Sequence, residues 1–423
     1  MIDHNSLNLS EDPERGWSFL LMLCLAEIAT MLLFSSYAAV LPIIQKEWQL
    51  TNAQSGWIYG SYQIGYLLAV VVLITLTDFI NPRYIYSASA VFAGLSGLLF
   101  SLTAEGVLSA TILRTMAGIG LAGTYMPGLK IIAEYYSREK RGGAVGLYVG
   151  SFTLGVSLSL YFTGKLTALY YWRTAFFLAS LGPLIGGILG YVILKGKFKD
   201  SSHSRASNKE DFSYKRVATN KPVMIMILAY MGHCWELFGL RGWIVAFLTE
   251  CLLSKDKLLT NAAETASFMA SIILLAGTPG NMISGFVSDR IGRMKAIVIS
   301  MLISSALSFT LGWTAGAPFY LVIFIALVYG FFVTADSSPL STAITEFANP
   351  AFRGSTMAVQ SFLGFLAASI SPVIMGWLMD LTNDSFGILK WGWGFSILGL
   401  GALIGPLGIY YLNTPQNIKL GRG

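Results

Sequence analysis

The sequence predicts an all-α integral membrane protein with twelve transmembrane helices in two pseudo-symmetric six-helix bundles. Three observations support this class. Only 12% of the 423 residues are charged and the mean hydropathy is +0.63, whereas a soluble domain carries about 25% charged residues. The apolar stretches are continuous and helix-length, which excludes an outer-membrane barrel of short alternating strands. A skeleton of four residues also occurs twice, half a chain apart.

Twelve apolar stretches are long enough to cross a bilayer, which takes about 20 residues. In the first half they are 17–43, 54–77, 84–103, 107–130, 142–164 and 172–194, and in the second half 222–248, 263–287, 294–314, 318–340, 354–379 and 387–412. The stretch between them is charged and lacks apolar periodicity. The sequence therefore predicts an N-terminal bundle (1–195), a cytoplasmic linker (196–221) and a C-terminal bundle (222–423).

Lysine and arginine are distributed unequally between the two sides of these spans. Of the 28, 20 fall on the side of the N-terminus, six on the other side and two within spans. Cytoplasmic loops carry the excess of basic residues in membrane proteins. We therefore expect both termini to be cytoplasmic, in the plasma membrane, which is the inner membrane if the cell is bacterial.

The repeated skeleton lies in "PGLKIIAEYYSREKRG" and "PLSTAITEFANPAFRG". It pairs Pro127, Glu134, Arg141 and Gly142 with Pro339, Glu346, Arg353 and Gly354, each 212 positions later. This offset maps the junction of the fourth and fifth spans onto that of the tenth and eleventh. Two halves of parallel topology are typical of secondary transporters whose substrate site lies near the midplane between them.

Two motifs carry a family resemblance. The stretch "GFVSDRIGRMK" after the eighth span resembles the signature G-x-x-x-D-R-x-G-R of the major facilitator superfamily, and "RTMAGIG" in the fourth span is similar to the family's R-x-x-x-G-x-G. The first signature places Gly285, Asp289, Arg290, Gly292 and Arg293, and the second places Arg114, Gly118 and Gly120. The first-half counterpart, "ITLTDFINPRY", keeps Asp78 and offers Arg83 for the missing arginine. The resemblance implies the fold of that superfamily and transport by alternating access.

The resemblance also implies a gate on the cytoplasmic face. Arg141-Gly142 and Arg353-Gly354 are expected to open the fifth and eleventh helices, whose N-termini attract carboxylates. The resemblance supplies Asp78 and Asp289 as those carboxylates, and arginines of the same face as ion-pair partners for two glutamates. The expected gate comprises Asp78, Arg83, Glu134, Arg141, Gly142, Gly285, Asp289, Arg290, Gly292, Arg293, Glu346, Arg353 and Gly354.

Ionisable residues inside spans are candidates for substrate and proton sites. Glu27 lies midway along the first span and Arg114 lies in the fourth. We expect these two to form an ion pair, or to share a proton and anion site. The alternative is a structural ion pair that fixes the packing.

The seventh span carries three further candidates in "YMGHCWELFGLRGW". His233 and Glu236 lie on one helical face, and a histidine beside a carboxylate titrates near neutral pH. Arg241 follows five residues later. The alternative is that His233 bonds a backbone carbonyl and Arg241 snorkels to the interface.

Asp336 in the tenth span precedes Pro339. With Ser337 and Ser338 it is expected to form a polar notch at a helix break, or else a structural cap. Aromatic residues of the second, fourth and seventh spans are candidate cavity walls, with membrane-interface belts or packing as the alternative. They are Tyr59, Tyr66, Tyr125, Tyr230, Trp235 and Trp243.

No catalytic, metal-binding or nucleotide-binding motif stands out, so we expect no enzymatic activity, no cofactor and no metal. The sequence predicts a secondary transporter, namely a proton-coupled symporter of a small organic or inorganic anion held between Arg114 and Arg241. Glu27 or the His233–Glu236 pair is expected to carry the proton. We expect a monomer in the lipid bilayer that binds no nucleic acid. Proton-coupled efflux of amphipathic drugs or metabolites is one alternative, disfavoured by the lack of a Gly-Pro motif in the fifth span. A transporter-like ligand sensor without flux is another.

Overall fold

The computed structural model describes residues 13–77, 79–196, 214–253, 258–349, 352–382 and 387–412. In this part of the chain every regular element is helical, and twelve segments are long and apolar enough to cross a membrane, which confirms the twelve predicted spans. The first six spans are α1 (Pro13–Met31) with α2 (Ser36–Glu47), α3 (Asn52–Leu76), α4 (Pro82–Thr103), α5 (Val107–Ala122) with α6 (Tyr125–Tyr135), α7 (Arg138–Tyr170) and α8 (Trp172–Ile193).

The last six spans follow the same order of long and broken helices. They are α10 (Lys221–Leu253), α11 (Leu259–Leu275) with α12 (Gly277–Ile291), α13 (Arg293–Leu311) with the 3-10 turn η1 (Gly312–Thr314), α14 (Phe319–Ala335) with α15 (Ser337–Phe347), α16 (Arg353–Leu381), and α17 (Ile388–Ala402) with α18 (Ile404–Leu412). A short helix, α9 (Tyr214–Thr219), lies within the predicted linker and packs on α10 and α16.

The repeated prolines explain why the fourth and tenth spans break at equivalent places. Pro127 is the third residue of α6 and Pro339 is the third residue of α15. Proline has no N–H to continue the ladder of the preceding helix, but it fits the first turn of a new helix, whose N–H groups lack partners anyway. Each span therefore ends and restarts just before its proline. The helix break predicted at Asp336 is confirmed.

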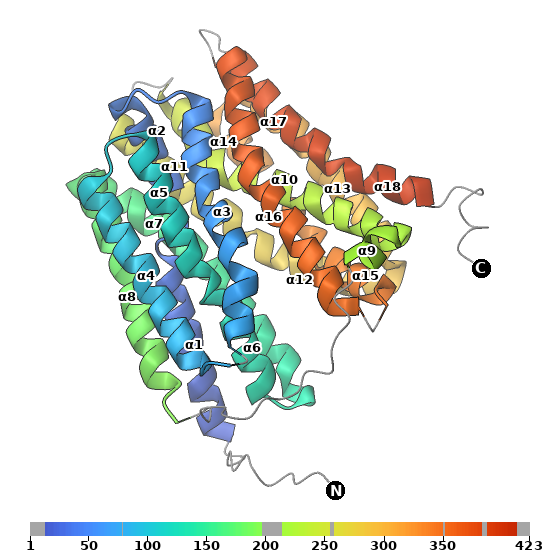
Figure 1. Cartoon of the computed structure of the whole chain (residues 1–423). Helices are drawn as coiled ribbons and strands as arrows, with labels where there is room; N and C mark the ends of the chain where they lie inside the picture. The colour runs from blue at the N-terminus through green and yellow to red at the C-terminus, as the bar shows by residue number, and fades with distance from the viewer. Residues whose placement is uncertain are drawn as a thin grey trace, which may run out of the picture.

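The helices form two groups that meet along two seams (Figure 1). Helices α1–α8 pack on one another, as do α10–α18, and the two groups are joined chiefly where α3 runs along α16 and α7 runs along α11. At one end of the molecule, α6 packs on helices of the first group and α15 on helices of the second. The groups spread apart toward this end in Figure 1.

At the other end of the bundle, polar bonds cross between the groups. We call this the closed end and define it by Asn52, Lys165, Glu264 and Asp380. The Asp380 carboxylate, at the end of α16, accepts hydrogen bonds from the backbone N–H groups of Asn52 and Ala53, both at 2.9 Å, and from the Asn52 side chain at 2.8 Å. It thus caps α3 of the other group. Lys165 Nζ lies 2.7 Å from Glu264 Oε1 and joins α7 to α11.

Two glycines of α3 allow the helices of the first seam to touch near the closed end. A Cβ atom on Gly56 would lie 2.2 Å from the carbonyl oxygen of Pro372, and one on Gly60 would lie 2.1 Å from that of Ser369. Both distances are far below van der Waals contact, so only glycine permits this approach of α3 to α16.

The opposite end carries Arg83, Lys130, Arg293 and Arg353, and we call it the basic end. Its ion pairs between described residues lie within one group. Arg293 contacts Asp289 and Glu346 in the second group, and Lys130 lies 4.0 Å from Glu134 in the first. The bonds that hold the two groups together are therefore concentrated at the closed end.

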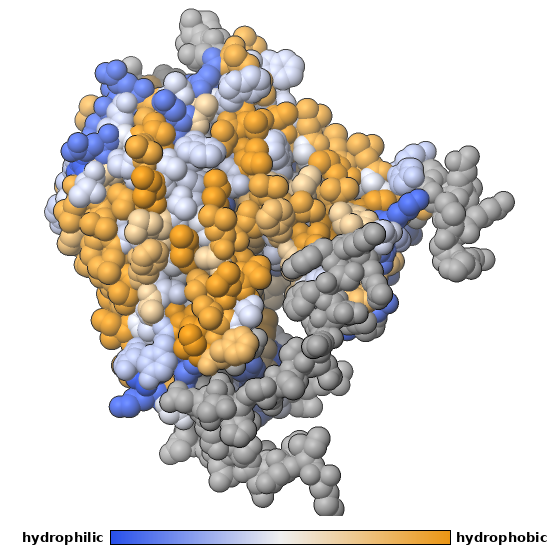
Figure 2. Space-filling view, in the orientation of Figure 1, coloured by the Kyte–Doolittle hydropathy of each residue, from blue (hydrophilic) through white to orange (hydrophobic). Residues whose placement is uncertain are grey.

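Apolar side chains cover the outer face of the bundle. Figure 2 shows an apolar band across both groups, with hydrophilic residues gathered toward the ends. Leu68, Val72, Phe362 and Trp377 are each more than half exposed. An apolar surface of this extent around a helical bundle fits the hydrocarbon core of a bilayer, so the chain is an integral membrane protein.

Candidate functional site

Arg114 on α5 is a buried cation with free hydrogen-bond donors. Its side chain is 1% exposed, and its Cζ atom lies 4.2 Å from the ring centroid of Tyr62 and 5.6 Å from that of Tyr37. Nη2 donates to the carbonyl oxygen of Phe34 at 3.4 Å, whereas Nε and Nη1 have no hydrogen-bond partner. An unpaired buried charge is costly, so these two N–H groups are suited to an anionic ligand.

Arg241 on α10 is the second arginine inside the bundle. Its Cζ atom lies 5.5 Å from the ring centroid of Phe238, and its buried Nε has no hydrogen-bond partner. The hydroxyl group of Tyr59, on α3, interacts electrostatically with both Arg114 and Arg241. The ring of Tyr59 also lies directly against Gly242 of α10. Tyr59 therefore contacts the residue that follows Arg241, and it lies on the same face of α3 as Tyr62, the ring that stacks on Arg114.

Glu27 on α1 is held by hydroxyl groups rather than by a cation. Its Oε2 atom accepts hydrogen bonds from Tyr148 at 2.8 Å, Thr30 at 3.4 Å and Tyr86 at 3.5 Å, and its buried Oε1 atom has no partner. The expected Glu27–Arg114 ion pair is wrong, because Glu27 and Arg114, both fully described, form none.

The break in the first span explains the missing ion pair. The predicted helix 17–43 is instead α1 and α2, separated by a turn over 32–35. This turn leaves the carbonyl oxygen of Phe34 outside the regular helix ladder, and Arg114 donates to it. A helix end leaves carbonyl groups that need donors, and here a buried arginine supplies one.

His233 and Asp336 form a buried acid–base pair. His233 is 3% exposed and Asp336 is 1% exposed, and Nδ1 of the histidine lies 2.7 Å from Oδ1 of the aspartate. Nε2 lies 3.1 Å from the hydroxyl group of Ser337. Asp336 directly precedes α15 but makes no cap hydrogen bond to its backbone. The polar notch predicted here is present, with His233 as the partner of Asp336 in place of a helix cap.

Glu236 lies apart from His233 in its own cluster, so the expected His233–Glu236 pair is wrong. The Glu236 carboxylate accepts hydrogen bonds from Ser304 at 2.5 Å and Tyr329 at 3.0 Å. It still interacts electrostatically with Asp336. Residues three apart share a helical face, but their side chains diverge to neighbouring helices when each finds a partner there.

The aromatic candidates separate into two kinds. Tyr59, Tyr66 and Tyr125 are linked electrostatically to the buried charges, and Tyr230 lies 5.7 Å from the His233 ring. The two tryptophans lie in the packing of the second group instead. Trp235 donates to the carbonyl oxygen of Ile397, and Trp243 donates to that of Pro372, both at 3.0 Å. A buried indole N–H that finds a backbone carbonyl packs as part of the scaffold.

Sequence reasoning missed Tyr62, although a signal was present. Tyr62 stacks on Arg114 and lies three residues after Tyr59 and four before Tyr66, so all three share one face of α3. The hydroxyl partners of the buried carboxylates, Tyr148 and Tyr329, were missed as well. Each is far from its carboxylate in sequence, and only the folded bundle brings the groups together.

Several expected gate residues find partners within their own half. Arg293 contacts Asp289 and lies 3.5 Å from Glu346, which confirms an arginine partner for that glutamate. An arginine partner for Glu134 is wrong, because its described partner is Lys130. Arg83 instead donates to the carbonyl oxygen of Tyr191 at 2.8 Å, and Arg141 donates to that of Tyr136 at 3.4 Å.

The remaining gate residues lie at the ends of helices. Arg353 and Gly354 open α16 as expected, whereas α7 begins at Arg138, before Arg141. Gly292 has a φ of +94° between α12 and α13, a conformation that favours glycine. Arg290 is exposed in the last turn of α12, and Gly285 faces Ser338. A Cβ on Gly142 would meet nothing within 4 Å, so no close approach occurs there. Asp78 lies outside the described residues.

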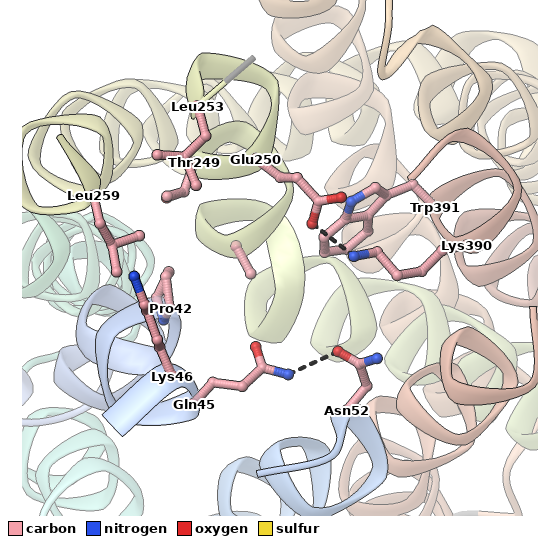
Figure 3. A pocket seen from close by; sticks show the side chains of 11 residues that line it. Pro42, Gln45, Lys46, Asn52, Thr249, Glu250, Leu253, Leu259, Lys390 and Trp391 are labelled. Atoms are coloured by element: carbon pink, nitrogen blue, oxygen red, sulfur yellow. Dashed lines mark hydrogen bonds and ion pairs between the residues drawn. The ribbon is translucent and has the colours of Figure 1, made fainter. Parts of the chain in front are cut away.

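A pocket of about 270 Å³ lies between the two groups at the closed end. Its lining includes Lys46 and Asn52 of the first group and Glu250 and Lys390 of the second, with Lys390 Nζ 2.7 Å from Glu250 Oε2. Figure 3 shows these side chains facing one another across the cavity. Ala246, one turn of α10 beyond Gly242, also lines it. The pocket therefore lies along α10 just beyond Tyr59 and the two arginines.

Comparison with known proteins places the chain in one family. The sequence profile of the Major Facilitator Superfamily matches residues 23–260 and 238–422. The hexuronate transporter of Bacillus subtilis is 23% identical over 406 residues, covering 91% of this chain and 93% of that protein. The benzoate transport protein of Acinetobacter baylyi is 20% identical and covers 89% of this chain and 85% of that protein.

A solved structure shares the fold. A bacterial homolog of the human lysosomal transporter Spinster, in an inward-facing and unoccupied conformation, superposes with a TM-score of 0.75 at 15% identity. The match covers 96% of this chain and 98% of that one.

Proposed function

The chain belongs to the Major Facilitator Superfamily and is a transporter rather than an enzyme, and we propose that it is a proton-coupled symporter of small carboxylate anions. One observation carries this proposal. Arg114 and Arg241 come from opposite halves. Arg114 is buried and keeps its Nε and Nη1 groups without partners, and Arg241 is half-buried and keeps its Nε group without one. A carboxylate matches the planar fork of a guanidinium group. Relatives that carry hexuronate and benzoate make the same chemical class plausible here.

We assign the basic end to the cytoplasm, in the plasma membrane, which is the inner membrane of a bacterial cell. The excess of lysine and arginine at this end supports that orientation, as does an N-terminal helix that starts there. Both termini are then cytoplasmic. We retain 1–195 and 222–423 as the two moving bundles with 196–221 as their linker. Because the halves are bonded at the closed end, this conformation corresponds to an inward-open state.

We assign proton binding to the His233–Asp336 pair. Its two groups lie 2.7 Å apart and are almost fully buried, and an imidazole ring beside a carboxylate is a pair of groups that both bind protons. The pair sits at the break between α14 and α15, where a change of charge acts on a helix junction. Glu236 interacts electrostatically with Asp336, so the charge of the cluster depends on all three groups.

We also propose that Asp289 closes the basic end in the opposite, outward-open state. In the present conformation its carboxylate contacts Arg293 of its own half. α7 begins at Arg138, and a carboxylate is favoured at the start of a helix, where the macrodipole is positive. When the basic end closes, Asp289 would exchange its local contact for α7 of the other half.

Uptake into proteoliposomes tests the anion clamp. Arg114→Lys keeps the charge but loses the planar fork, so we expect carboxylate uptake to fall at least about tenfold, which corresponds to about 1.4 kcal/mol. Arg173→Lys is the matched control, because Arg173 donates to the carbonyl oxygens of Ser101 and Ala104. We expect that control to retain most uptake. Uptake by Arg114→Lys at the wild-type rate, in folded protein, would contradict the clamp.

A further inference from the structure

Aromatic rings extend without interruption from Arg114 into the first half. The Arg114 guanidinium lies 4.2 Å from the ring of Tyr62, which lies 5.5 Å from that of Phe34. Phe34 in turn lies 5.6 Å from Phe152, and Phe152 lies 4.7 Å from Tyr125. Each of these separations is in the range of favourable ring contact. The cation therefore stands at one end of a continuous series of ring contacts, which are edge-to-face between Tyr62, Phe34 and Phe152.

A second set of rings extends from Arg241 and crosses between the halves. Arg241 lies 5.5 Å from the ring of Phe238, which lies 5.9 Å from Phe365 on α16. Phe365 lies 4.3 Å from Tyr66 on α3, and Tyr66 lies one helical turn after Tyr62 of the first set, on the same face of α3. The two arginines are thus connected by one aromatic surface, with the contact between Tyr66 and Phe365 as its bridge between the halves.

The aromatic rings around the two arginines favour some classes of carboxylate ligand over others. A sugar acid carries several hydroxyl groups, and each one buried without a partner costs about 1–3 kcal/mol. An aromatic acid has a carboxylate for a guanidinium group and a planar face for rings, and each aromatic contact contributes about 0.5–1.5 kcal/mol beyond area burial. Guanidinium groups stacked on rings also keep their N–H edges directed outward from the ring face, where a carboxylate binds.

We propose that the arginine site takes aromatic monocarboxylates in preference to polyhydroxylated sugar acids. This inference rests on the proposed function and narrows its substrate class. The carboxylate binds the free N–H groups of Arg114, and the ring of the substrate lies against the surface formed by Tyr66 and Phe365. Because that surface includes both halves, a bound ring contacts both and links substrate binding to their relative movement.

Thermal unfolding of the purified protein with three carboxylates tests the preference. Benzoate supplies a ring, cyclohexanecarboxylate a non-planar body of similar size, and a hexuronate a polyhydroxylated body. A ligand stabilises the folded protein according to its concentration over its Kd. We expect benzoate to raise the unfolding temperature most, and the hexuronate least. A larger shift with the hexuronate would overturn the preference while leaving carboxylate transport intact. No shift and no uptake with any of the three would instead count against the proposed function.

One pair of variants locates the preference. Phe365→Leu removes the bridging ring, and Phe362→Leu is the control, because Phe362 is 54% exposed and, in the part of the chain that the structure describes, has no ring contact. We expect Phe365→Leu to weaken benzoate binding about three- to tenfold, as the loss of a ring contact implies, with little change for the hexuronate. Equal weakening of both ligands, or an equal effect of Phe362→Leu, would show a merely structural role and overturn the assignment. If Phe365→Leu fails to fold, the ligand series on the unmodified protein still decides the proposal.

Discussion

The two halves of the molecule repeat a backbone but differ in the chemistry that it carries. Glu27 on α1 and Glu236 on α10 are buried carboxylates of the first span of each half, and tyrosine hydroxyl groups bind both. The fourth and tenth spans break at equivalent prolines. At the second break stands Asp336 beside His233, whereas the equivalent position of the first half is Thr124, whose hydroxyl bonds the carbonyl oxygen of Leu121.

This difference separates carboxylates bound by hydroxyl groups from one that lies beside a histidine. Glu27 and Glu236 each accept hydroxyl hydrogen bonds within their own half, whereas Asp336 lies beside His233, with which we propose that it binds the transported proton. The repeat therefore supplies the same helix junction twice, and only the C-terminal half carries an acid–base pair there. Four predictions test this contrast, beginning with the largest expected effect.

Asp336→Asn should abolish proton-driven accumulation. Removing the carboxylate leaves His233 without its acid partner, so the pair no longer gains and loses a proton in the transport cycle. Accumulation driven by a pH gradient should fall to the level measured without a gradient, while exchange of labelled for unlabelled substrate continues. Glu27→Gln serves as the matched control in the other half and should keep gradient-driven accumulation. The contrast between the halves fails if Glu27→Gln loses coupling and Asp336→Asn keeps it.

Glu27→Ala should lower stability rather than change coupling. It removes the acceptor of Tyr148 and leaves that buried hydroxyl unsatisfied, at a cost of about 1–3 kcal/mol. Glu27→Gln keeps an acceptor oxygen and should cost less than half as much. The free energy of unfolding in a detergent titration measures both. Equal losses for the two variants would mean that the charge of Glu27, and not its acceptor role, matters.

Asp380→Ala should loosen the closed end. Asn52 and Glu264 occupy equivalent positions 212 residues apart, yet Asp380 caps α3 with three hydrogen bonds, whereas Lys165 and Glu264 form one partly exposed ion pair. A helix cap contributes about 1 kcal/mol, so Asp380→Ala should raise the outward-open population about fivefold.

Maleimide labelling of a Thr249→Cys reporter in the closed-end pocket measures this shift. Lys165→Gln is the comparison, and its effect should be smaller because exposed ion pairs contribute little. If Lys165→Gln increases labelling more than Asp380→Ala does, the contact between α7 and α11 stabilises the closed end more than the contact between α3 and α16, which contradicts the prediction.

Asp289→Asn should have the smallest effect, about twofold, because the carboxylate is exposed and solvent screens its interactions. The variant loses the proposed contact with α7, so the inward-open state gains population. Cysteine labelling in the inner stretch of α7, for example at Gly146→Cys, should increase. Arg290→Gln, which changes an exposed neighbour, is the control. Unchanged labelling with Asp289→Asn would remove this residue from the gate.

Most of the fold was predictable because the bilayer imposes a length and a polarity on each span. All twelve spans were found from apolar length alone, and the break near Asp336 followed from Pro339. The break between α1 and α2 was not predicted, because the only proline nearby, Pro42, lies inside α2. With a continuous first helix, Glu27 was expected to face Arg114. In the broken helix, Arg114 instead binds the carbonyl oxygen of Phe34.

The site was predictable in its residue types and less so in its pairs. Intramembrane charges are rare enough that Arg114, Arg241, His233 and Asp336 could be selected from sequence. Which of them meet depends on helix rotation and on contacts between distant spans. His233 reaches Asp336 from 103 positions away (336 minus 233), a pairing that spacing within one helix cannot indicate.

The close contact between α3 and α16, which Gly56 and Gly60 permit, has an evolutionary consequence. At Gly56 and Gly60 even a single added methyl group collides with a backbone carbonyl of α16, so neither position can drift without separating the halves. The aromatic residues around the arginines pack against other side chains rather than against the backbone. Replacing one apolar side chain by another of similar volume at such a position costs less free energy. The rings around the arginines can therefore change in descendants of this chain while the joint between the bundles stays the same.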